Sequence, residues 1–73
     1  MQPQVRTRSS LDVQLPRLRE QRERRALSQK ELSILSGLSR TSIIKLEGGR
    51  NAWPSTVRKL AKALRVKPED LQG

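Results

Sequence analysis

Residues 28–50 read SQKELSILSGLSRTSIIKLEGGR, and this stretch decides the fold of the 73-residue chain. It opens with a capping box, because the Ser28 hydroxyl can accept a hydrogen bond from the amide of Glu31 while the Glu31 carboxylate accepts one from the amide of Ser28. Gly37 can take the left-handed conformation that ends many helices. The sequence therefore predicts a helix that begins after Ser28 and stops at Gly37.

A second helix is expected after a turn of only three residues, at positions 37–39. Ser39 can cap this helix and the glycine pair at 48–49 can end it, so that it covers residues 40–47. A turn this short makes the two helices cross at a steep angle, with the small side chain of Ser33 at their contact. This is the geometry of a helix-turn-helix, whose second helix projects from the surface and fits the major groove of DNA.

The rest of the chain also has helical spacing. From Leu15 onward, apolar residues recur at intervals of three and four, and no stretch alternates as a β-strand would. The pattern predicts further helices over residues 16–25, 55–64 and 68–72, with a loop over residues 50–54. We therefore expect an all-α fold.

The core is expected to consist of leucine and isoleucine, since the chain has a single aromatic residue, Trp53. We expect Trp53 to cap this small core, and the alternative is a contact with a sugar-phosphate backbone. The side chains expected to form the apolar faces of the helices are Leu15, Leu18, Leu32, Leu35, Ile43, Leu46, Val57, Leu60, Ala61, Leu64 and Leu71.

The chain contains neither cysteine nor histidine. This excludes a disulfide framework, a thiolate or imidazole metal site and a Ser-His-Asp or Cys-His catalytic arrangement. The seven acidic residues are scattered among basic ones, so we expect no enzyme, no metal and no cofactor. The chain has no apolar run of about 18 residues and no signal peptide, so we expect a soluble, cytoplasmic, nucleoid-associated protein without a membrane partner.

Sixteen lysines and arginines against seven acidic residues give a net charge of +9. This places nucleic acid first among the expected partners and an anionic membrane surface second. Residues 1–13 are polar and basic without any period, so we expect a disordered arm there and a folded domain over residues 14–73. Arg6 and Arg8 in the arm could enter a minor groove, and the alternative is a tail that adds only non-specific attraction.

The sequence from Leu15 to Leu71 resembles the phage Cro and repressor type helix-turn-helix family, also called the xenobiotic-response-element family. The resemblance implies a compact five-helix, lambda-repressor-like DNA-binding domain. The segments that carry the likeness are SQKELS (28–33), GLSR (37–40), IIKLEGGR (43–50), PS (54–55) and LAKAL (60–64).

The resemblance also assigns roles to individual positions. It implies that base edges in double-stranded DNA are contacted by Arg40, Thr41 and Lys45. It implies that the DNA backbone is contacted by Gln29, Lys30, Ser42 and Arg50. The chemistry agrees, because Arg and Lys can bond guanine acceptors and Thr can meet a thymine methyl. Arg22 and Glu47 match a partly buried ion pair of the family, which is structural. The alternative for the exposed polar residues is an ordinary solvated face.

Four positions depart from the family pattern. Ala26 and Arg65 stand at helix ends where glycine is common, and a left-handed residue with a side chain costs about 1 kcal/mol or more. Ser33 replaces the usual alanine between the two helices of the motif, so its hydroxyl must bond a carbonyl. Ile44 is apolar where the family is mostly polar, and it could meet a thymine methyl, a second subunit or water.

By this resemblance the chain is expected to be a sequence-specific transcriptional regulator that reads the major groove with residues 40–47 and acts by occupancy. Repression is the favoured outcome of that occupancy, and activation is the alternative. Family members bind as two-fold dimers. The dimer surface is thin here, so we expect a weak homodimer or a dimer formed on DNA. Two alternatives with a protein partner stay open: an antitoxin whose arm up to Val13 blocks a toxin, and an interaction adaptor that does not read DNA.

Overall fold

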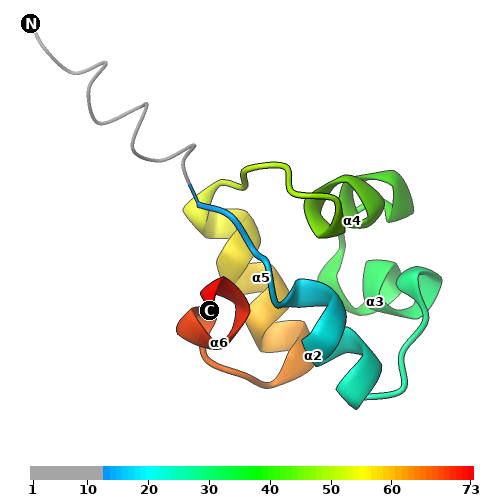
Figure 1. Ribbon diagram of the computed structural model, residues 1–73. Coiled ribbons are helices and arrows are strands. Elements are labelled where there is room, and N and C mark those ends of the chain that lie inside the picture. Colours follow the sequence, from blue (N-terminus) through cyan, green and yellow to red (C-terminus); the bar gives the residue numbers. More distant parts are fainter. Residues whose placement is uncertain (1–12) are drawn as a thin grey trace, which may run out of the picture.

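The computed structural model describes residues 13–73, and helices make up most of this part of the chain (Figure 1). The described segment has no β-strand beyond one isolated bridge, so the expected all-α, five-helix fold is confirmed. In chain order the helices are α2 (Leu18–Arg24), α3 (Gln29–Ser36), α4 (Arg40–Glu47), α5 (Pro54–Leu64) and α6 (Pro68–Gln72).

The first helix is shorter than the expected range 16–25. It begins at Leu18, because the backbone of Arg17 (φ −105°, ψ 11°) is not helical. The amide of Arg17 donates to the carbonyl of Leu71 in α6 (3.1 Å) and ties this turn to the end of the chain. It ends at Arg24, and α5 begins at Pro54, one residue earlier than expected. Proline suits this first helical position, since it needs no amide donor there.

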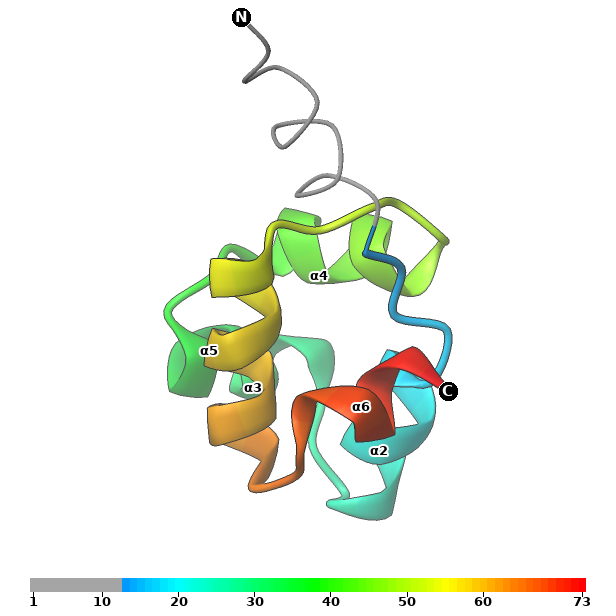
Figure 2. The same ribbon diagram turned by 90° about the vertical axis from the view of Figure 1, so that its left-hand side faces the viewer.

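The core lies where α5 packs against α3 and α6, with α2 beside α6 and α4 above them (Figures 1 and 2). Ten of the eleven side chains expected on apolar faces are buried, and Ala52 joins them from the loop before α5. The buried set is Leu15, Leu18, Leu32, Ile43, Leu46, Ala52, Val57, Leu60, Ala61, Leu64 and Leu71.

Two expectations about the core were wrong. Leu35 was expected to face inward, but its side chain is 58% exposed. The buried residue of α3 is Leu32, whereas Leu35 lines a surface groove between α3 and α5. Trp53 was expected to cap the core, but it is 48% exposed and lies outside the buried cluster.

The unusual helix ends adopt the conformations that the sequence implies. Ala26 (φ 55°) and Arg65 (φ 58°) are left-handed despite their side chains, and Gly37 (φ 79°) ends α3. The Ser33 hydroxyl donates to the carbonyl of Leu38, so this polar group between α3 and α4 is satisfied. This bond holds the short turn between α3 and α4 against α3.

The described chain starts beside the loop that follows α4. Val13, expected in the arm, forms an antiparallel bridge with Ala52, whose amide donates to the Val13 carbonyl at 2.7 Å. Arg6 and Arg8 lie outside the described residues. None of the helices between residues 13 and 73 is long and apolar enough to cross a bilayer.

Candidate nucleic-acid interface

The caps of α3 and α4 hold the motif in place. The Ser28 hydroxyl accepts from the Glu31 amide (3.0 Å), and the Glu31 carboxylate accepts from the Ser28 amide (2.8 Å), so the expected capping box is present. At the start of α4 the Ser39 hydroxyl accepts from the amide of Ser42 (3.1 Å). Both helix starts are therefore defined by side chains, and α4 covers the expected residues 40–47.

One side of α4 faces the core and the other faces solvent. Ile43 and Leu46 are buried and anchor the helix. Because a helix repeats every 3.6 residues, the positions on the opposite side point outward together. The exposed residues of that side are Arg40, Thr41, Ile44 and Lys45. The three side chains to which the sequence assigns base contacts thus share one solvent-facing surface, with an isoleucine among them.

The expected ion pair between Arg22 and Glu47 ties α2 to the last residue of α4. Arg22 Nε lies 2.6 Å from Glu47 Oε2, and the two side chains are only 11% and 7% exposed. The guanidinium also donates to the Leu27 carbonyl (2.7 Å). The hydrogen bond with Glu47 raises the pKa of Arg22, so the arginine stays charged at any working pH. This pair holds the C-terminal end of α4 against α2.

Gln29 joins the same network from the first position of α3. Its Nε2 donates to Oε1 of Glu47 (3.1 Å), which leaves the second amide hydrogen and the side-chain oxygen free for another partner. The backbone amides of Gln29 and Lys30 also point out of the helix start without an intrahelical acceptor. This end of α3 therefore offers several donors side by side.

These donors line a depression of about 630 Å³ that α3 shares with α2 and α4. It brings together Gln29, Lys30 and Arg40, all of which the sequence assigns to DNA contacts, and adds Arg19, which it did not single out. Positive side chains and free amides at a helix N-terminus suit an anion. A phosphate of a nucleic-acid backbone fits the chemistry of this depression.

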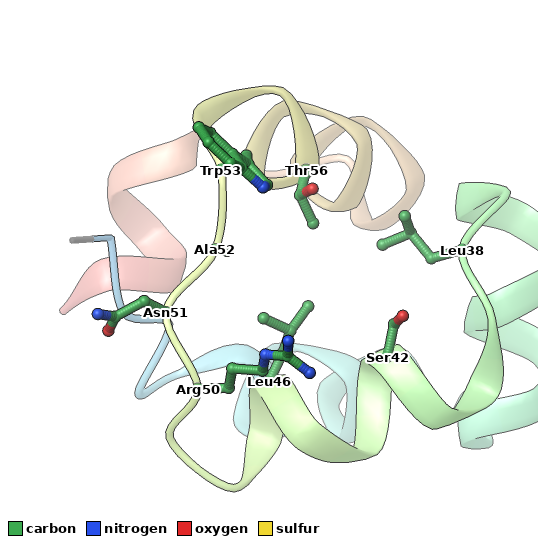
Figure 3. A pocket seen from close by; sticks show the side chains of 8 residues that line it. All are labelled: Leu38, Ser42, Leu46, Arg50, Asn51, Ala52, Trp53 and Thr56. Carbon is green, nitrogen blue, oxygen red and sulfur yellow. The ribbon is translucent and has the colours of Figure 1, made fainter. Parts of the chain in front are cut away.

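A second depression, of about 510 Å³, lies between α4 and the start of α5 (Figure 3). Ser42 and Arg50 line it on the α4 side, and Trp53 and Thr56 line it from the opposite side. Sequence reasoning weighed a backbone contact for Trp53 but preferred the core, and it missed Thr56. The signal available was Pro54, which marks the start of α5 and so places Trp53 and Thr56 on either side of that helix start.

Few carboxylates offset the positive charge of this surface. The ion pairs between residues 13 and 73 involve Arg17, which caps α2, and Arg19, Arg22 and Arg24 on α2. None of them uses the cations near α4, which are Lys30, Arg40, Lys45 and Arg50. All four are exposed, so this face of the folded domain presents unpaired positive charge to a polyanion.

Comparisons with known proteins agree with this geometry. A family model of the helix-turn-helix domain matches residues 16–72. Over 58 residues the chain is 40% identical to the HTH-type transcriptional regulator RghRB of Bacillus subtilis strain 168, a match that covers 77% of this chain and 42% of RghRB. The chain thus matches less than half the length of that relative.

Among solved structures, the restriction-modification controller protein C.AhdI from Aeromonas hydrophila resembles the chain with a TM-score of 0.72 and 44% sequence identity. The match covers 77% of this chain and 86% of C.AhdI. The chain therefore belongs to the helix-turn-helix domain family, and within it to the phage Cro and repressor type.

Proposed function

We propose that the chain binds a specific sequence of double-stranded DNA by laying α4 in the major groove, and that it represses transcription by occupying that site. The observation that carries this proposal is the exposed surface formed by Arg40, Thr41, Ile44 and Lys45, opposite the buried Ile43 and Leu46. Arg40 and Lys45 contact guanine acceptors, and Thr41 and Ile44 contact a thymine methyl group.

Phosphates on the two sides of the groove occupy the two depressions that flank α4. On one side Gln29 and Lys30 at the start of α3 hold a phosphate, supported by the positive end of that helix. On the other side Ser42 and Arg50 hold a phosphate of the second strand, next to Trp53. These contacts set affinity and register, whereas α4 sets sequence preference.

The same proposal covers several wider properties. A weak homodimer, or one formed on DNA, places two copies of α4 on half-sites about one helical turn apart. Arg6 and Arg8 add contacts in a minor groove. The protein acts in the cytoplasm at the nucleoid, and no catalytic step is part of its function.

The 44% identity to C.AhdI makes genes of a restriction-modification system the first targets to test.

Selection from a pool of randomised duplexes tests this function. The chain is expected to enrich one motif with two-fold symmetry, and the variant that replaces Arg40, Thr41 and Lys45 by alanine is expected to enrich none. Lys67→Ala, an exposed lysine at the start of α6, serves as the matched control and is expected to enrich the wild-type motif. A folded wild-type chain that enriches no motif would instead be an adaptor.

A further inference from the structure

A groove of about 520 Å³ runs between α3 and the C-terminal half of α5. The C-terminal half of α5 lies at the end of the molecule away from α4, with α3 at its side (Figure 2). None of the groove's residues lines either depression of the nucleic-acid interface. The residues that line it are Leu35, Ser36, Lys59, Lys62, Ala63 and Arg65.

The groove has an apolar part that folding leaves uncovered. Leu35 is 58% exposed, and its neighbour Ile34 on the same helix is 71% exposed. Neither side chain belongs to the buried core, to which α3 contributes Leu32. The apolar side chains that line the groove are Leu35 and Ala63, and Ile34 adds a second exposed apolar side chain on α3. Exposed apolar surface of this kind is typical of a site that another protein covers.

The rim of the groove is positively charged. Lys59, Lys62 and Arg65 are exposed, and none of them takes part in an ion pair with any residue from 13 to 73. Arg25 approaches the same end of the groove, since its guanidinium donates to the Arg65 carbonyl (3.2 Å). No carboxylate lines the groove. The surface therefore combines leucine with several free cations.

We propose that this groove binds an acidic amphipathic helix of a partner protein. Leucine-like side chains of such a helix would cover Leu35 and Ala63, and its carboxylates would pair with Lys59 and Lys62. A second copy of this chain fits less well, because a two-fold contact through the groove would bring the same cations face to face in a protein of net charge +9. A nucleic acid would use the cations but has no group that needs Leu35.

The position of the groove, away from the residues assigned to DNA, indicates a role for the interaction. Because the groove lies apart from the residues assigned to DNA, the acidic helix and a duplex can bind the same molecule together. The domain would then connect a protein partner to the DNA site. This inference does not depend on the proposed base contacts, since it can be tested without DNA.

The experiment measures binding of a synthetic peptide of about 14 residues to the full-length chain by fluorescence anisotropy. The peptide carries leucines at positions i, i+4 and i+7 and glutamates at the flanking positions, and a control peptide carries lysines in place of the glutamates. Lys62→Glu is compared with Lys67→Glu, which makes the same charge change outside the groove. Leu35→Ser tests the apolar contact.

The proposal expects the acidic peptide to bind and the lysine peptide not to bind. Lys62→Glu and Leu35→Ser are each expected to weaken binding about tenfold, whereas Lys67→Glu changes it by less than about twofold. The inference is overturned if the acidic peptide does not bind, if Lys67→Glu weakens binding as much as Lys62→Glu, or if Leu35→Ser has no effect. It is also overturned if Lys62→Glu weakens duplex binding much more than Lys67→Glu, because the groove would then belong to the nucleic acid.

Discussion

Arg22 Nε donates to Oε2 of Glu47 across 2.6 Å, and this bond joins the last turn of α2 to the last residue of α4. Glu47 also accepts from Gln29, so one carboxylate fixes the positions of three helices. The side chains that the proposal places against DNA therefore depend on a contact that itself touches no DNA.

Glu47→Ala is expected to destabilise the protein by about 3 kcal/mol, because it leaves the nearly buried Arg22 guanidinium without its counter-ion. Urea denaturation measures the loss. Glu23→Ala is the matched control, since it removes the exposed pair with Arg19 and is expected to cost no more than about 0.5 kcal/mol. Equal losses in the two variants would show that the Arg22–Glu47 pair does not hold α4.

Ala26→Gly is expected to stabilise the protein by about 0.5 to 1 kcal/mol, because Ala26 is left-handed (φ 55°) and glycine adopts this conformation without a Cβ clash. Ala63→Gly, within helix α5, is expected to cost about 1 kcal/mol and serves as the opposite control. Both are read from urea denaturation midpoints. A loss of stability with Ala26→Gly would count against strain at this helix end.

The fluorescence of Trp53, the single tryptophan of the chain, is expected to become less accessible to acrylamide when the protein binds a duplex. The side chain is 48% exposed and lines the depression beside Ser42 and Arg50, where a phosphate is proposed to lie. Quenching is measured with and without saturating duplex. Unchanged quenching in the complex would remove Trp53 from the interface.

Affinity for the duplex is expected to fall steeply with salt. If about five phosphates are neutralised, the logarithm of the association constant falls with the logarithm of salt concentration at a slope near −4.5. Lys30→Ala is expected to reduce this slope by about 0.9 without changing base preference, whereas Lys67→Ala leaves it unchanged. A slope that is the same in the wild type and in Lys30→Ala would exclude this lysine from the backbone contacts.

Much of the fold could be predicted from the sequence because local signals agree along the motif. Ser28, Glu31 and Gly37 mark the ends of α3 by their own hydrogen bonds and backbone preferences, which need no distant partner. The left-handed Ala26 and Arg65 were expected from the family resemblance, because they stand at helix ends where the family commonly has glycine. These features depend on neighbours within a few residues.

The two errors about the core concern side chains whose surroundings are set by distant parts of the chain. Leu35 has the helical spacing of a core residue, but the core takes only Leu32 from α3, and Leu35 lies at the surface beside the C-terminal half of α5. Trp53 is large and apolar, yet Ala52 fills the core position in that loop because its amide pairs with Val13. The spacing of apolar residues does not show which side of a short helix will pack against another helix.

Protection of guanine N7 from methylation tests most directly whether α4 lies in the major groove, since N7 is exposed only there. On the duplex obtained by selection, the wild-type chain is expected to protect guanines in each half-site. Arg40→Ala is expected to lose protection at one guanine and to relax preference at that position at a cost of about 1 to 3 kcal/mol, whereas Gln29→Ala weakens all sequences alike. The account is contradicted if the bound wild-type protein protects no guanine N7. It is also contradicted if the variant in which Arg40, Thr41 and Lys45 are all replaced by alanine still protects the same guanines.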